Sequence, residues 1–280
     1  MLDQKRFNVS LLKKDHLIAL KEIAEKDEQL PIARIYLNSD LAFDDEVLAI
    51  CQALKELIPG TEWILELPKI LRKNDTDYLE RISKLLDGSS LFQGALIGNL
   101  EAAGFFDEKK SQKKLYGDHN LYLWNSKAVE EWGQILSGGC LPLELRREEI
   151  KELLKMPFLW EKVIYGRIPM MVTANCVAKT NGNCPAPSNE SFRLRDRMGK
   201  DFPVYRNCAH CYNIIYNSLP LSLHGSLSKY PDEVLFRIML TMEGKGEALQ
   251  VLSYFLLGSY AENVPFSGEY TTGHEKRGAL

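Results

Sequence analysis

The stretch from residue 34 to residue 67 reads RIYLNSDLAFDDEVLAICQALKELIPGTEWILEL, and its pattern decides the fold. Its two ends, residues 34–38 and 63–67, are apolar runs of strand length. Between them the apolar residues recur at helical spacing: Val47, Leu48, Cys51, Leu54 and Ile58. A strand, a helix and a second strand form the repeating unit of a parallel sheet, so the stretch predicts an α/β protein.

The same alternation continues on both sides of this stretch. Further helices are predicted around residues 17–23, 78–86 and 128–136. Further strands are expected at residues 7–12, 94–99, 121–125, 141–145 and 162–164. About seven parallel strands alternating with helices favour a (β/α) barrel of the TIM type, either complete or incomplete.

The alternation of strand and helix patterns stops near residue 165, so we expect residues 1–165 to form the barrel-like region. Residues 166–280 are expected to form a cysteine-bearing α+β segment. Within it, residues 192–197 and 201–206 predict a hairpin whose turn holds Gly199. A strand at 236–241 and a helix at 248–256 follow.

Composition narrows the class of protein. The longest apolar stretches, such as residues 251–257, are too short to span a bilayer, and the first residues lack a signal-peptide core. We therefore expect a cytoplasmic protein without a membrane partner. The net charge is only -3, but residues 162–210 hold eight basic and three acidic side chains. This local excess could contact phosphate, as in RNA, or could be an ordinary solvated surface.

Four of the six cysteines fall close together: Cys176, Cys184, Cys208 and Cys211. In a cytoplasmic protein such a group indicates a metal site before it indicates disulfides. Four thiolates suit a tetrahedral zinc ion or an iron–sulfur cluster. The seven-residue interval between the first two cysteines favours a cluster slightly, because zinc sites commonly use two short knuckles. Purely structural thiols are the third alternative.

Other polar residues are candidates for a reactive site. His210 lies between Cys208 and Cys211, which allows a thiolate–imidazole nucleophile, although neighbours in sequence rarely have the required geometry. Arg167 follows a predicted strand and is, with His210, a candidate catalytic residue. Several predicted strands end in polar side chains that could point into a barrel mouth: Asn38, Glu66, Asn99, Asn125 and Glu144. His119 is a weaker candidate.

Several longer motifs carry a family resemblance. They are YGRIPMMVT at 165–173, LRDRMGKDFPV at 194–204, NCAHCYN at 207–213, NSLPL at 217–221 and the terminal residues Thr272, Gly273, His274, Lys276, Arg277 and Gly278. Together with Cys176 and Cys184, they resemble the peptidase U-32 family, the collagenase-like proteases. The motifs cover about 115 residues of the second half of the chain, and the first half matches more loosely.

The resemblance implies two kinds of activity. The family was named for proteolysis, with collagen among the proposed substrates, and it gives no catalytic triad to transfer. Other members are iron–sulfur proteins that hydroxylate bases in transfer or ribosomal RNA, or that act in oxygen-independent hydroxylation of quinones. There the four matching cysteines would hold a 4Fe-4S cluster.

The local basic excess favours the RNA branch, with Arg195 and Arg197 as candidate substrate-binding residues beside Asn125 and Glu144. Longer family members also imply a missing domain or a partner subunit. A collagenase-like peptidase and a metal-stabilised binding module remain alternatives.

Overall fold

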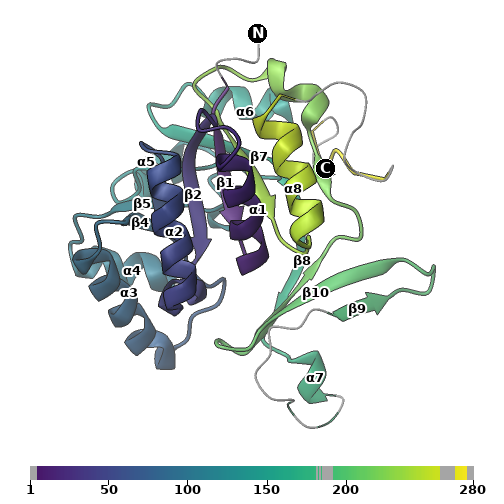
Figure 1. Cartoon of the computed structure of the whole chain (residues 1–280), viewed down its shortest axis with the longest axis horizontal. Helices are drawn as coiled ribbons and strands as arrows, with labels where there is room; N and C mark the ends of the chain where they lie inside the picture. Colours follow the sequence, from purple (N-terminus) through teal and green to yellow (C-terminus); the bar gives the residue numbers. More distant parts are fainter. Residues whose placement is uncertain (1–4, 181, 183, 185–191, 259–268, 276–280) are drawn as a thin grey trace.

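A closed barrel of eight parallel strands forms the body of the protein (Figure 1). The computed structural model describes residues 5–180, 182, 184, 192–258 and 269–275. The barrel strands are, in order around the ring, β1 (Phe7–Leu11), β2 (Ile32–Asn38), β3 (Glu62–Glu66), β4 (Phe92–Ile97), β5 (Lys114–Gly117), β6 (Gly138–Cys140), β7 (Leu159–Gly166) and β13 (Leu235–Leu240). Pairing of β6 with β7 and of β13 with β1 closes the ring, so the predicted TIM-like barrel is confirmed and is complete.

Helices cover the outside of the barrel and bury the outward-facing half of each strand. They are α1 (Lys14–Ala24), α2 (Asp45–Leu57), α3 (Thr76–Gly88), α4 (Leu100–Glu108), α5 (Ser126–Trp132), α6 (Arg147–Leu153) and α8 (Lys245–Leu256). On β2, Ile35 and Leu37 face outward into the main hydrophobic core, together with Leu17 and Leu20 of α1. The alternate residue Tyr36 faces inward, as the two-residue period of a strand requires.

Two of the predicted strands are misplaced in the sequence-based reading. Residues 122–125 and 141–145 are loops, Leu121 ends a short 3-10 helix (His119–Leu121), and the real strands β5 and β6 precede these segments. Tyr122 has a left-handed backbone (φ 52°), which excludes it from a strand. The apolar pattern misled the prediction because β6 is only Gly-Gly-Cys, without the branched side chains that usually indicate a strand.

A second sheet is inserted between β7 and β13. Its four antiparallel strands are β8 (Pro169–Thr173), β11 (Tyr212–Tyr216), β10 (Asp201–Asn207) and β9 (Phe192–Arg195), in that spatial order. The predicted hairpin around residues 196–200 is confirmed as the β9–β10 connection. A short helix, α7 (Val177–Thr180), follows β8. In Figure 1 this sheet projects beside the carboxyl ends of the barrel strands.

Residues 166–280 thus contribute to both parts of the molecule. The inserted sheet comes from them, but so do β13 and α8, which belong to the barrel. The short strand β12 (Leu221–Ser222) pairs antiparallel with β7 and makes a bridge to Thr271. No helix within the described part of the chain is long and apolar enough to cross a lipid bilayer.

Candidate functional site

The inside of the barrel is charged as well as apolar. Arg237 of β13 is fully buried, and its guanidinium contacts three carboxylates. They are Asp118 at 2.7 Å, Glu161 at 3.2 Å and Glu66 at 3.2 Å. Glu66 ends β3 and Asp118 follows β5, so this network reaches the carboxyl-terminal mouth, where barrel enzymes place their reacting groups.

Asp118 is a buried carboxylate of this mouth, and its neighbours shift its pKa. Burial alone would raise the pKa of Asp118, but its basic neighbours outweigh burial and hold the pKa well below its usual value. These neighbours are His119, Lys69 and Arg237. Lys69 also lies 3.5 Å from Glu66, and the pKa of Lys69 is raised because the carboxylates outweigh its burial. The mouth therefore holds fixed charges of both signs.

Three of the four cysteines, Cys176, Cys208 and Cys211, lie at one end of the inserted sheet. Cys208 and Cys211 belong to the tight turn between β10 and β11, and Cys211 there has a left-handed backbone (φ 50°). Cys176 follows β8, and the preceding residue, Asn175, accepts a hydrogen bond of 2.7 Å from Asn213 at the start of β11. Cys184 follows α7. None of these four cysteines forms a disulfide with another described residue, and Cys184 and Cys211 are exposed.

The four thiols are the right type of ligand for four-thiolate coordination, but the structure does not gather them around one point. Among residues 5–180, 182, 184, 192–258 and 269–275, no three His, Cys, Asp or Glu side chains gather where they could hold a metal ion. The iron–sulfur or zinc assignment of Cys176, Cys184, Cys208 and Cys211 therefore stays a prediction.

The turn that carries Cys208 and Cys211 is fastened to the barrel through His210. The imidazole is buried, with Nε2 3.2 Å from Asp40 and Nδ1 3.0 Å from Asp75. Burial lowers the pKa of His210, but the two carboxylates outweigh it and the net shift is upward. Both ring nitrogens are used in this way, so His210 is not placed as a base for a neighbouring thiol. Its geometry makes it a positioning residue.

Further contacts reinforce this attachment. Arg72 donates hydrogen bonds to the backbone carbonyls of His210 and Cys211, and the amide of Lys69 donates to the hydroxyl of Tyr212 (3.1 Å). Asn207 donates to Asp40 at 2.9 Å. The loops after β2 and β3 thus hold the cysteine-bearing end of the sheet over the barrel mouth.

We expect His210→Ala to release this end of the sheet while the barrel stays folded. Removing the imidazole leaves Asp40 and Asp75 without their shared partner, at a cost of about 1–3 kcal/mol in docking free energy. Limited trypsin digestion should then cut the β9–β10 hairpin faster than in the wild type, with unchanged far-ultraviolet circular dichroism. Equal cleavage rates would show that His210 does not fasten the sheet.

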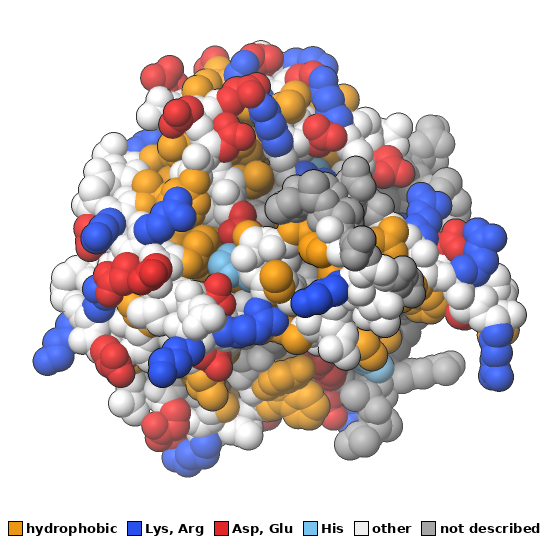
Figure 2. Space-filling view, turned by 90° about the horizontal axis from the view of Figure 1, so that it is seen from below, with side chains coloured by type: hydrophobic (Ala, Val, Ile, Leu, Met, Phe, Trp, Pro, Cys, Tyr) orange, Lys and Arg blue, Asp and Glu red, His pale blue; other side chains and the backbone are white. Residues whose placement is uncertain are grey.

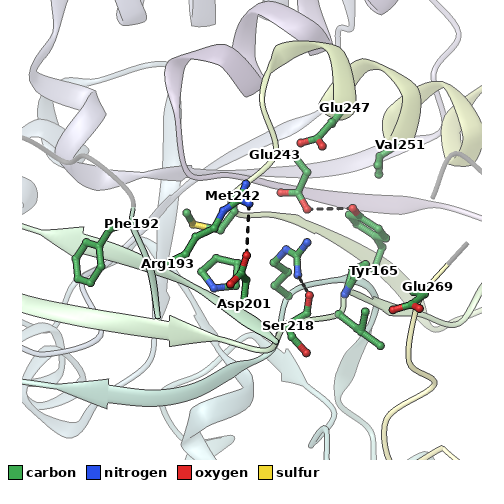
Figure 3. A pocket seen from close by; sticks show the side chains of 14 residues that line it. Tyr165, Phe192, Arg193, Asp201, Ser218, Met242, Glu243, Glu247, Val251 and Glu269 are labelled. Atoms are coloured by element: carbon green, nitrogen blue, oxygen red, sulfur yellow. Dashed lines mark hydrogen bonds and ion pairs between the residues drawn. The ribbon is translucent and has the colours of Figure 1, made fainter. Parts of the chain in front are cut away.

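A cavity of about 470 Å³ opens at the carboxyl ends of β7 and β13, under the base of the β9–β10 hairpin (Figure 3). Its lining comes from the barrel, from α8 and from the inserted sheet, and includes Tyr165, Arg167, Arg193, Asp201, Glu243 and Glu247. A polar cavity of this size at this end of a barrel is the expected place for a ligand.

The structure places the sequence-predicted residues in different settings. The Arg167 guanidinium lines the cavity and donates to the carbonyls of Asn217 and Ser218. Asn125 caps α5 by accepting from the Ala128 amide, so its side chain serves the helix.

The remaining candidate substrate-binding residues are Glu144 and two arginines of the β9–β10 hairpin. Glu144 lies in the loop after β6, and its buried Oε2 has no hydrogen-bond partner among the residues that the structure describes. Arg195 forms an exposed bidentate pair with Asp201, at 2.7 and 3.0 Å, and Arg197 is exposed at the hairpin turn.

Figure 2 looks from below onto the barrel mouth and the inserted sheet. Lys and Arg side chains are interspersed with Asp and Glu on this face, among apolar side chains. The coloured basic side chains therefore form no single continuous patch on this face.

Sequence reasoning missed Lys69, Asp118, Arg237 and Glu243. Arg237 did carry a signal, because a single cation within the apolar run FRIML has to be paired if the run is a buried strand. Asp118 directly follows a strand that was itself misplaced, and Lys69 and Glu243 lie in loops, so no pattern indicated them.

Comparisons with known proteins give distant structural likenesses. No family model and no curated protein sequence matches the chain. A solved U32 peptidase shares 9% identity at a TM-score of 0.46, over 58% of this chain and 70% of that one.

Two aldolases are also similar in structure. A protein of Coccidioides immitis described as a fructose-1,6-bisphosphate aldolase shares 13% identity (TM-score 0.41, 57% of this chain, 65% of that one). The YdjI aldolase of Escherichia coli K12 shares 10% (TM-score 0.36, 57% and 66%). At these values the likenesses assign no activity to this chain.

Proposed function

We propose that this protein is a U32-type barrel enzyme that hydroxylates a base in transfer or ribosomal RNA, with a 4Fe-4S cluster held by its inserted sheet. The observation that carries the proposal is the turn with Cys208 and Cys211, which His210 attaches to the barrel mouth, with Cys176 after the neighbouring strand β8. The sequence motifs around these cysteines support the U32 assignment, because they resemble those of that family. Cys176, Cys184, Cys208 and Cys211 would be the ligands, and a bound cluster would supply electron transfer.

The protein's own residues have separate tasks in this proposal. The contacts of His210 and Arg72 hold the cysteine-bearing turn against the barrel, which keeps a cluster near the mouth. Lys69 and Asp118 at the mouth offer fixed charges to orient a substrate. The exposed side chains of Arg197 and Lys200 at the hairpin turn could contact RNA phosphates.

The cluster is tested by metal analysis of protein purified without oxygen. We expect a brown protein with about four iron and four sulfide per chain. Cys208→Ser should lose most of the iron, whereas Cys51→Ala, which removes a buried thiol of α2 outside the set, should keep it. Colourless wild-type protein carrying one zinc ion would contradict the cluster and leave a structural metal.

The substrate is tested by mass spectrometry of nucleosides from cells with and without the gene. A hydroxylated nucleoside should disappear from transfer or ribosomal RNA in the deletion strain. Wild-type protein should restore it and Cys208→Ser should not. Unchanged RNA profiles together with gelatin cleavage by the purified protein would favour the peptidase instead.

A further inference from the structure

The cavity beside α8 has two walls of opposite charge. Glu243 and Glu247, from the β13–α8 connection and the first turns of α8, form one wall. Arg167, after β7, and Arg193, on β9, form the other. Figure 3 shows the two glutamates above the cavity and Arg193 on the side of the hairpin.

Hydrogen bonds hold the carboxylates of the acidic wall in place. Glu243 is 5% exposed, and its carboxylate accepts hydrogen bonds from the Tyr165 hydroxyl (3.0 Å) and from the Thr241 amide. Burial and the nearby Glu243 both raise the pKa of Tyr165, so the phenol stays protonated and keeps donating. Glu247 is exposed to the cavity and is held by the Gly244 amide at 3.2 Å.

The arginines of the basic wall have N–H groups that can donate to a ligand. The Arg167 guanidinium gives one nitrogen, Nη1, to the carbonyls of Asn217 and Ser218, and a guanidinium has five N–H groups. Arg193 forms a long ion pair (3.9 Å) with Asp201, which also lines the cavity and is bound by Arg195 in a bidentate pair. Because this contact is longer than a hydrogen bond, the N–H groups of Arg193 can still donate to a carboxylate ligand.

We infer that this cavity binds a small zwitterion of the amino-acid class. The ammonium would lie against Glu243 and Glu247, and the carboxylate against Arg193 and Arg167. A nucleotide fits less well, because its phosphates would meet Glu243, Glu247 and the exposed Glu269 in the same space. Two oppositely charged walls select a ligand with both charges over one with a single charge.

The test is binding of free L-amino acids and dialanine to the whole protein, first by thermal shift and then by titration calorimetry of the best ligand. The matched probes are its N-acetyl derivative and its amide, which each lack one charge. We expect each to bind at least roughly tenfold more weakly, the loss expected for one charge-assisted hydrogen bond. Equal binding of all three, or no binding by any amino acid, would overturn the inference.

Two variants locate the ligand. Arg193→Gln and Glu247→Gln should each weaken binding roughly tenfold. Both positions are exposed, and glutamine can still accept the hydrogen bond from Gly244, so folding is preserved. Glu152→Gln, an exposed carboxylate on α6 outside the cavity, should bind as the wild type does.

Binding lost equally in all three variants, or in none, would place the ligand elsewhere and overturn the inference. The measurement needs neither iron nor RNA, so its failure is distinct from failure of the proposed function.

Discussion

Replacing Arg237 by methionine should lower the free energy of unfolding by about 3–5 kcal/mol, because the change leaves buried carboxylates without their cationic partner. The guanidinium is fully buried and contacts Asp118 and Glu161 within 3.2 Å. Methionine fills a similar space, so the loss comes from unpaired charge rather than from a cavity. Urea unfolding followed by fluorescence and circular dichroism measures it.

The matched control is Arg195→Met, which breaks an ion pair of similar geometry at the surface. Arg195 and Asp201 are 2.7 Å apart, but the arginine side chain is 70% exposed. We expect a change below about 1 kcal/mol, because solvent screens exposed pairs. If both variants lose the same stability, burial is not what makes the Arg237 network important.

The pH dependence of the Arg237→Met variant follows from the sign of the Asp118 shift. In the wild type the pKa of Asp118 is depressed, so its contribution to stability is present above the unfolded pKa and is lost as pH falls through the folded value. Without Arg237 the folded pKa rises, since one cation is gone. The stability gap between variant and wild type should therefore narrow as pH falls below about 3.9, the pKa of an unfolded aspartate, towards the folded value.

Gly94→Ala should be almost as damaging, with a loss of about 3 kcal/mol, at the upper end of what overpacking costs. A Cβ added at Gly94 of β4 would lie 1.9 Å from the backbone oxygen of Lys114 on β5, and a backbone atom cannot turn aside. Strands β4 and β5 would have to separate, with loss of their pairing. The midpoint of thermal unfolding measures the effect.

Gly104→Ala is the control for this change. Gly104 lies in α4, and a Cβ there meets nothing within 4 Å. Alanine should leave stability unchanged or raise it by about 0.5–1 kcal/mol, since it restricts the unfolded chain. A Gly94→Ala protein that melts with the wild type would mean that β4 and β5 are not as close as the structure has them.

The periodicity of the sequence predicted the barrel but not all of its parts. Val47, Cys51 and Leu54 do lie on the buried face of α2, as expected. The eighth strand was recognised as a strand at residues 236–241, but its place in the barrel could not be read, because pairing with β1 joins residues more than 220 positions apart. Local patterns contain no information about such partners.

The candidate site was predictable only in part. The spacing of the cysteines indicated a group of four, and the structure brings Cys176, Cys208 and Cys211 to one end of a sheet. The role of His210 could not be predicted, since its partners Asp40 and Asp75 lie in loops after β2 and β3. The two-walled cavity combines residues from three separate regions of the chain, so it becomes visible only in the folded molecule.

The late position of β13 has a consequence for synthesis of the protein on the ribosome. Until residues 235–240 emerge, β1 and β7 have no neighbour on one side, and their peptide groups are open to pairing with other chains. The inserted sheet is translated after β7 and before β13, while these strands still lack their partner. Nascent chains stalled before residue 235 should therefore depend on a chaperone, whereas chains released after α8 should not.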